Sequence, residues 1–232
     1  MPRLVRALTA AILAAAFVVP TLSHAATQSA GLGTVYIHVT PSSIGVVGSL
    51  TSGAVNVRIR TTGTKDAAVL LIRLNPGVTP AKIQAFTRSK ASNDLNNVTE
   101  VMGALVMDSD APRGITALQV VLQPGLYAAL NISNHNGQGP HTLFSVARSP
   151  QPAALPPRQA TVHAIDFGFR GAGILHNGSV VRYYNNGHVV HMFIAIRAAS
   201  LQGARQIVTL LKEGRDRKAL PLATGTAELA GP

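Results

Sequence analysis

Histidine and methionine are the side chains of this sequence with the clearest potential for chemistry. His188 and His191 lie three residues apart, and Met192 follows the second of them. On a strand, a spacing of three places two side chains on opposite faces, so His188 and His191 are not expected to chelate one ion together. His135 and His141 lie on one loop-like stretch and could approach His191 from another part of the fold. Imidazoles bind Cu(II) and Zn(II), so the candidate metal ligands are His191, His141, His135 and Met192.

The sequence contains no cysteine, which limits this chemistry. No thiolate is available as a nucleophile or as a soft metal ligand, and no disulfide can form. The aspartates are spread over expected loops and strand ends, without the pairing that acid–base catalysis needs. They are Asp66, Asp94, Asp108, Asp110 and Asp166. The sequence therefore predicts a protein that is not an enzyme.

An internal repeat organises the elements that must position these residues. Residues 36–73 recur as residues 161–197, at an offset of 125 that falls to 124 inside an expected strand. His38 matches His163, and two glycines with the apolar positions between them also match. Such a pattern indicates a repeated supersecondary unit. The second copy lacks the sequence that follows the first.

Most of the mature sequence consists of short apolar runs separated by turn residues, which is typical of an antiparallel β-sandwich. Gln123, Pro124 and Gly125 form a tight-turn signal between two such runs and predict a hairpin. One helix interrupts each copy, capped by Thr79 in the first and by Ser200 in the second, and the apolar face of the second is expected to pack on its own sheet. The expected strands are residues 35–39, 54–60, 69–74, 115–122 and 126–132.

The N-terminus has the features of a secretory signal. Two arginines precede an apolar run that is too short to span a bilayer, and a small-residue cleavage site follows, so the protein is expected to be secreted. The sequence ends at residues 228–232, which are expected to form a loop. Because a sandwich without its last strands also exposes unpaired backbone, we favour a longer native product, or else strands supplied by another chain or by the first domain. The expected segments are a signal peptide (1–25), a first domain (26–147), a Pro-rich linker (148–160) and a second domain without its C-terminal strands (161–232).

The composition is strongly basic. The formal net charge is +11, and removal of the leader with its two arginines leaves 18 basic against 9 acidic residues, or +9. Scattered basic residues, few aromatic residues and no tryptophan argue against a specific nucleic-acid partner. A soluble basic protein without a specific anionic ligand is the favoured interpretation of this charge, and an anionic cell-surface polymer or lipid is the candidate partner.

Residues 185–193, Asn-Asn-Gly-His-Val-Val-His-Met-Phe, resemble a strand of the cupredoxin family of small secreted β-sandwiches. Residues 166–169, Asp-Phe-Gly-Phe, resemble the first strands of the same family. The resemblance implies that His191 occupies the position of the first histidine ligand of a type 1 copper site. The other ligands of the family, Cys, His and often Met, follow a Pro-Gly-x-Tyr strand near the end of the domain.

The first copy contains that ending, because residues 124–127 read Pro-Gly-Leu-Tyr. The resemblance places Asn131 at the cysteine position and His141 near the second histidine, while Ala67 takes the position of the first histidine. A blue-copper site needs a thiolate together with two imidazoles. The resemblance therefore implies that the first copy holds no type 1 copper.

Together these features predict an all-β protein of two cupredoxin-like Greek-key β-sandwich domains, each with a short inserted helix, the second domain being incomplete. The expected function is that of a secreted, non-enzymatic binding or scaffolding protein without a complete type 1 copper site. No resident cofactor is expected, and copper is the one candidate. The alternative is a copper-binding electron-transfer protein whose site around His191 is completed by a longer native product or by a partner.

Overall fold

The structure is a computed structural model that describes residues 31–64, 67–89, 95–110, 116–133, 139–166, 168–171 and 179–231. The expected signal peptide lies outside the described residues. Strands dominate the rest, with a few short helices, so the predicted all-β sandwich class is confirmed. No helix in the described ranges has the length and apolar character needed to cross a bilayer.

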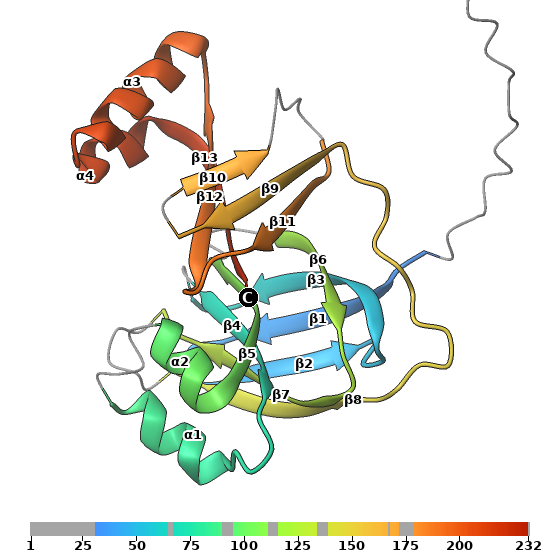
Figure 1. Cartoon of the computed structure of the whole chain (residues 1–232). Coiled ribbons are helices and arrows are strands. Elements are labelled where there is room, and N and C mark those ends of the chain that lie inside the picture. The colour runs from blue at the N-terminus through green and yellow to red at the C-terminus, as the bar shows by residue number, and fades with distance from the viewer. Residues whose placement is uncertain are drawn as a thin grey trace, which may run out of the picture.

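The first half of the fold, residues 33–146, is a sandwich of two facing sheets (Figure 1). One sheet has the order β2-β1-β3-β6, and the other contains β5-β4-β7-β8. Strand β3 pairs parallel with β1 and antiparallel with β6, so the sheet is mixed rather than purely antiparallel. The strands are β1 (Gly33–Val39), β2 (Ile44–Gly48), β3 (Gly53–Thr61), β4 (Ala68–Leu74), β5 (Gly103–Asp110), β6 (Thr116–Leu122), β7 (Gly125–Asn131) and β8 (His141–Val146).

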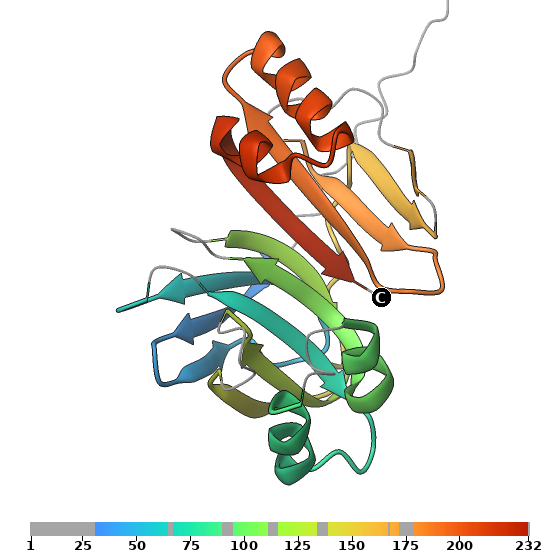
Figure 2. The same cartoon turned by 90° about the vertical axis from the view of Figure 1, so that its left-hand side faces the viewer.

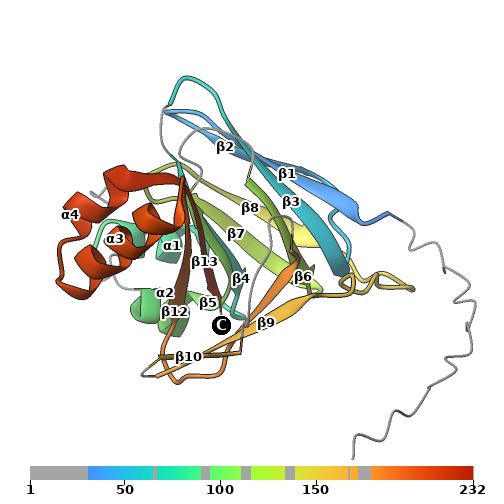
Figure 3. The same cartoon turned by 90° about the horizontal axis from the view of Figure 1, so that it is seen from above.

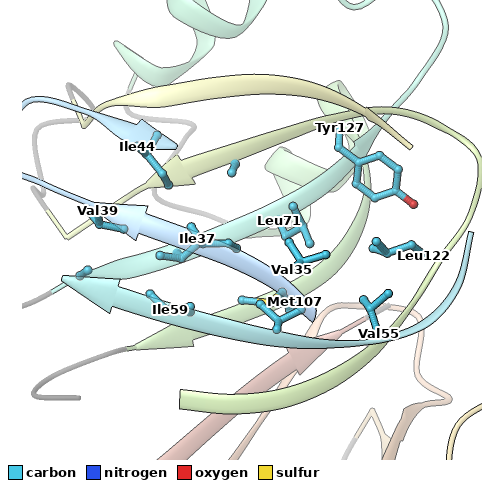
Figure 4. Close-up of a cluster of buried hydrophobic side chains, with 14 of the residues drawn as sticks. Val35, Ile37, Val39, Ile44, Val55, Ile59, Leu71, Met107, Leu122 and Tyr127 are labelled. Carbon is cyan, nitrogen blue, oxygen red and sulfur yellow. The ribbon is translucent and has the colours of Figure 1, made fainter. Parts of the chain in front are cut away.

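The core between these sheets follows from the alternation of apolar and polar residues. In β3, Val55, Val57 and Ile59 are buried, whereas Arg58 and Arg60 on the opposite face are exposed. Each such burial contributes about 1.5–3 kcal/mol. Figure 4 shows the resulting cluster, in which side chains of both sheets interdigitate.

Two helices cover the outer face of the second sheet. Helix α1 (Pro80–Thr87) begins as predicted, with the Thr79 hydroxyl accepting a hydrogen bond from the backbone N–H of Lys82 at 3.2 Å. Helix α2 (Leu95–Met102) was not predicted. These helices form an apolar cluster with β4, β5 and β7, called here the helix-side cluster. Its buried members are Leu70, Ile72, Leu74, Val78, Ile83, Val98, Met102, Leu105, Ala128 and Leu130.

The second half, residues 160–231, repeats the strand arrangement of the first half in part. Its three-stranded sheet has the order β10-β9-β11. Strand β9 is parallel to β11 and antiparallel to β10. In the first half, β1 is likewise parallel to β3 and antiparallel to β2. Helix α3 is capped by Ser200 as predicted. The elements are β9 (Ala160–Ile165), β10 (Gly168–Gly171), β11 (Val181–Asn185), β12 (His191–Ala198), α3 (Leu201–Lys212), α4 (Asp216–Ala219), η2 (Leu220–Leu222) and β13 (Ala223–Gly231).

The two halves share one sheet. Strand β13 pairs antiparallel with β12 on one edge and with β5 on the other, so the order is β12-β13-β5-β4-β7-β8 (Figures 2 and 3). Ala230 lies opposite Asp108 at the junction. The sequence analysis took residues 228–232 for loop, and this was wrong up to Gly231. The glycines of this segment suggest a turn, but its pairing with a strand on each edge stabilises it as a strand.

The predicted hairpin at Gln123–Gly125 was also wrong. Strand β6 pairs with β3 and β7 pairs with β4, so the turn crosses from one sheet to the other. The Tyr127 hydroxyl donates to the carbonyl of Gln123 at 2.8 Å and accepts from its N–H at 2.9 Å. Burial raises the pKa of this tyrosine, opposed by the hydrogen bond with Gln123 and by Arg73. The Pro-Gly-x-Tyr motif thus fixes the crossing between the sheets.

The strand register shows where along the repeat the second copy is one residue shorter than the first. Tyr36 lies opposite Arg58 in the first half, and Thr161 lies opposite Arg182 in the second, so these positions correspond. The offset is still 125 along β10 and is 124 throughout β11. The missing residue therefore falls in the connection between β10 and β11, and not inside a strand.

The Pro-rich segment between the halves runs along the first half without pairing as a strand. The N–H of Ala54 donates to the carbonyl of Ala153 at 2.7 Å, and the Arg182 guanidinium donates to the carbonyl of Pro156 at 2.8 Å. The segment is thus fastened to β3 on one side and to β11 on the other.

Candidate functional site

The candidate site lies where the β11–β12 loop meets the turn between β9 and β10. His191 begins β12, and Asp166 lies in the turn after β9. The Nε2 atom of His191 is 3.3 Å from Oδ1 of Asp166, and both side chains are partly buried. The histidine at the position of the first copper ligand therefore has an acidic partner within its own half.

The same carboxylate organises the loop. The backbone N–H of His188 donates to Oδ1 of Asp166 at 2.6 Å. His188 lies in the loop and not on a strand, so the opposite-face argument made for His188 and His191 does not apply. The Asn185 amide closes the loop, because its Nδ2 donates to the carbonyl of Val189 at 2.8 Å and its Oδ1 accepts from the N–H of Gly187 at 3.1 Å.

Electrostatics favour the ionised carboxylate at this position. The hydrogen bond from the His188 N–H lowers the pKa of Asp166 below its ordinary value of 3.8, against a smaller effect of desolvation. The His191 side chain lowers this pKa further. Asp166 is therefore an anion at neutral pH, placed to bind the imidazole and the loop backbone together.

Gly187 is required by this arrangement. A Cβ atom at position 187 would collide with Nε2 of His191 and with Oδ1 of Asp166. In the first half the matching residues are Gly63 and Pro41, and a Cβ at Gly63 would meet only the Pro41 ring at 3.5 Å. The close approach of the backbone to the contact between Asp166 and His191 is thus specific to the second half.

The loop also contacts the first half. The N–H of Val190 donates to Oδ1 of Asn96 in α2 at 2.7 Å, and the Val190 side chain packs against the helix-side cluster. The Tyr183 hydroxyl donates to the carbonyl of His191 at 2.8 Å. The backbone around His191 is therefore held by Asn96 of the first half on one side and by Tyr183 of β11 on the other.

His38 and His163 make matching interactions on the first strand of each half. Nε2 of His38 lies 2.9 Å from the Thr62 hydroxyl, and Nδ1 of His163 lies 2.6 Å from Oδ1 of Asn186. Thr62 and Asn186 both follow the strand parallel to that first strand. His163 also stacks on Tyr184, with ring centroids 5.3 Å apart. This recurrence supports the structural role expected for the two histidines.

In the first half, the three positions implied by the resemblance do lie together. Ala67 precedes β4, Asn131 ends β7 and His141 begins β8, with the N–H of Asn131 donating to the carbonyl of Pro140 at 2.9 Å. Ala67 and Asn131 are buried. Oδ1 of Asn131 accepts from the N–H of Ser133 at 3.2 Å, so this side chain closes a turn.

These residues do not fit a type 1 copper ion. The chain has no thiol, the first half has Ala67 in place of a histidine, and the His191 imidazole contacts a carboxylate. The metal ligation predicted for His191, His141, His135 and Met192 stays a prediction. His135 lies outside the described residues, as does the Met192 side chain, and the described part of the chain contains no group of three His, Asp or Glu side chains able to hold a metal ion.

The sequence analysis missed Asp166 as the partner of His191. In the repeat, Asp166 matches Pro41 and His191 matches Ala67. Two polar residues therefore appear together in one copy and are absent together from the other. Because the two copies differ at most matched positions, this joint change alone did not mark the two residues as partners.

No protein-family model and no curated protein matches this chain. Among solved structures, auracyanin from the photosynthetic bacterium Roseiflexus castenholzii is 14% identical, with a TM-score of 0.32 over 50% of this chain and 97% of that one. Auracyanin A, a "blue" copper protein from Chloroflexus aurantiacus, is 11% identical, with a TM-score of 0.30 over 50% and 98% of the two chains. Lac15 from a marine microbial metagenome is 11% identical, with a TM-score of 0.25 over 71% and 48%. Likeness this distant assigns neither a function nor a ligand to this chain.

Proposed function

We propose that this chain is a secreted, non-enzymatic binding or scaffolding protein with a cupredoxin-like frame and without a complete type 1 copper site. The observation that carries the proposal is the contact between Asp166 and His191. His191 is the only histidine at a position that the resemblance gives to the first copper ligand. Its contact with Asp166, together with the hydrogen bond from the His188 N–H to the same carboxylate, fastens the β11–β12 loop to the turn after β9. The absence of cysteine removes the thiolate that blue copper needs.

The basic surface supports an anionic cell-surface polymer or lipid as one ligand. Arg58 and Arg60 are exposed on the outer face of β3, and Tyr36 and His38 lie opposite them on β1. Four side chains able to donate to an anion or to lie against one thus share a flat face of the first sheet. The net charge of the chain would draw anions toward that face.

One observation favours the alternative, a copper-binding electron-transfer protein. His191 begins β12, whose outer edge has no neighbouring strand among the described residues. Strands added at that edge by a longer product or a partner could place further ligands beside the imidazole. The release of His191 from Asp166 would have to accompany such ligation.

Cu(II) titration of the purified mature chain tests the proposal, with visible absorption and EPR as readouts and His191→Ala and His163→Ala as matched variants. We expect no intense thiolate band and no stoichiometric binding that depends on His191. Tight binding of one equivalent, abolished in His191→Ala and retained in His163→Ala, would contradict the proposal and support the alternative.

A further inference from the structure

The outer face of the first sheet carries a group of side chains that the strand register brings together. The residues on either side of Tyr36 in β1 are buried, so Tyr36 itself points outward. Tyr36 lies opposite Val47 of β2 on one side and opposite Arg58 of β3 on the other. His38 lies opposite Arg60. Directly opposed side chains share a face of the sheet, and these five residues are called here the outer-face group.

Two members of this group form one exposed apolar patch. Tyr36 is 49% exposed and Val47 is 63% exposed. Apolar residues scattered singly over a protein surface are common and need no explanation. Tyr36 and Val47 are instead direct neighbours across two paired strands, close enough for their side chains to touch. They therefore present a single apolar surface beside Arg58.

The two arginines beside this patch are available to an anion. Arg58 and Arg60 are exposed, and neither side chain makes an ion pair or a hydrogen bond with another described residue. The four strands of this sheet contain no acidic residue. The neutral amides of the same face pair with their neighbours, because Asn56 donates to the carbonyl of Leu32 at 3.2 Å and accepts from Gln119 at 3.1 Å. The unmatched charge of the face is thus positive.

The described elements leave this group uncovered. Helices α1 and α2 pack on β4, β5 and β7 of the other sheet. The Pro-rich segment reaches β3 at the start of the strand, where the N–H of Ala54 donates to the carbonyl of Ala153. Arg58 and Arg60 lie toward the other end of that strand. A large partner can therefore approach the outer-face group directly.

The mixed chemistry of the face favours a lipid surface over a soluble anionic polymer. Guanidinium groups form bidentate hydrogen bonds with phosphate in either partner. A hydrated polymer gains nothing from contact with the side chain of Val47. A bilayer has an apolar layer directly beneath its phosphates, and tyrosine is enriched at that boundary. Binding at such an interface strengthens both with buried apolar area and with attraction to anionic lipids.

We propose that the outer-face group docks on the surface of an anionic lipid bilayer. Arg58 and Arg60 bind lipid phosphates, and Tyr36 and Val47 enter the boundary between the headgroups and the acyl chains. The net charge of +11 draws the chain toward such a surface, and the outer-face group sets its orientation there. This inference rests on the proposed binding role and names the lipid, rather than the polymer, as the partner of this face.

The first test places a fluorescent reporter in the apolar patch of the purified mature chain. The chain contains no tryptophan, so Tyr36→Trp introduces a single indole. The probes are phosphatidylcholine vesicles with and without phosphatidylglycerol, each also prepared with lipids brominated on the acyl chains. We expect a blue shift and bromine quenching of the emission only when phosphatidylglycerol is present, because the indole then enters the interface. Val208→Trp, at a position of α3 that is also 49% exposed, is the matched reporter and should show neither effect.

A second test removes the apolar patch. The double variant Tyr36→Thr, Val47→Thr keeps side chains that suit strands. We expect it to bind phosphatidylglycerol vesicles about tenfold more weakly in cosedimentation, and the loss should persist as salt rises because salt does not screen apolar burial. Leu201→Thr with Val208→Thr removes side chains that are 69% and 49% exposed in α3, and it should change binding by less than about twofold.

Three outcomes would overturn the inference. Equal responses of the two reporters, or equal losses in the two double variants, would mean adsorption through net charge without a defined face. Binding of dextran sulfate that depends on Arg58 and Arg60, with no emission change on vesicles, would assign the face to a soluble polymer. The inference and the proposed function fail separately. Stoichiometric copper binding at His191 contradicts the proposed function, whereas absent vesicle binding contradicts only the lipid partner.

Discussion

Asp166 is the residue on which the geometry around His191 depends. Its carboxylate contacts the His191 ring and accepts the N–H of His188, and the second of these lowers its pKa most. Since the folded-state pKa lies below 3.8, the ionised form stabilises the fold above that pH, and the stabilisation is lost as the pH falls through the folded value.

We therefore predict that Asp166→Asn lowers stability at pH 7 and that its difference from wild type shrinks as the pH falls below 3.8. Urea unfolding at pH 7 and at a series of acidic pH values measures this. Glu213→Gln, which removes an exposed ion pair with Arg215, is the matched control and should have a small effect at every pH. A difference for Asp166→Asn that does not change with pH would refute the role assigned to its charge.

Gly187→Ala tests the close approach of the loop to the contact between Asp166 and His191. The added Cβ collides with Nε2 of His191 and with Oδ1 of Asp166, so the loop must shift, at a cost of about 1–3 kcal/mol. Gly168→Ala is the control, because nothing lies within 4 Å of its added Cβ. Equal unfolding midpoints for the two variants would show that the loop is looser than described.

The turn between β6 and β7 is the element that ties the two sheets of the first half together. Its two hydrogen bonds between Tyr127 and Gln123 would both be lost in Tyr127→Phe. We predict a loss of about 1–2 kcal/mol in the free energy of unfolding by urea, against a negligible change for the exposed Tyr36→Phe. No loss in the first variant would mean that packing alone holds the crossing.

The sequence predicted five strands of the first half and both helix caps, because apolar alternation and capping are local properties of the chain. Strands β2, β5 and β8 and helix α2 were missed. The partner sheet of β6 and β7 was wrongly assigned, since a turn signal does not say which sheet receives the next strand. Strand β13 was taken for loop because its conformation depends on β5 and β12, which are distant in the sequence.

The candidate site was predictable only in part. His191 was found from its motif, whereas Asp166 comes from a turn 25 residues earlier, and only the fold brings the two together. Asn96 and Val190 are 94 residues apart, and their hydrogen bond fixes the same loop across the two halves. Contacts of this kind leave no local pattern in the sequence.

At the scale of the whole molecule, the exposed side chains of Arg58 and Arg60 make the outer face of the first sheet cationic on a chain of net charge +11. We predict that the double variant Arg58→Gln, Arg60→Gln binds phosphatidylglycerol vesicles more weakly than wild type at low salt, and that the difference narrows as salt rises. Vesicle cosedimentation measures this. Arg170→Gln with Arg217→Gln removes the same charge from exposed positions of the second half and serves as the control. Equal losses for the two pairs would mean that net charge, and not this face, attracts the membrane.

Hydrogen exchange measured by mass spectrometry on the mature chain tests the described strand order of the second half most directly. Strand β4 is paired on both edges, whereas β12 is paired only with β13 in the described structure. We predict that about half of the β12 amides exchange quickly while those of β4 and β13 stay protected, because only the free edge opens to solvent. Protection of β12 equal to that of β4 in the free protein would show that its edge is already filled and would contradict the account.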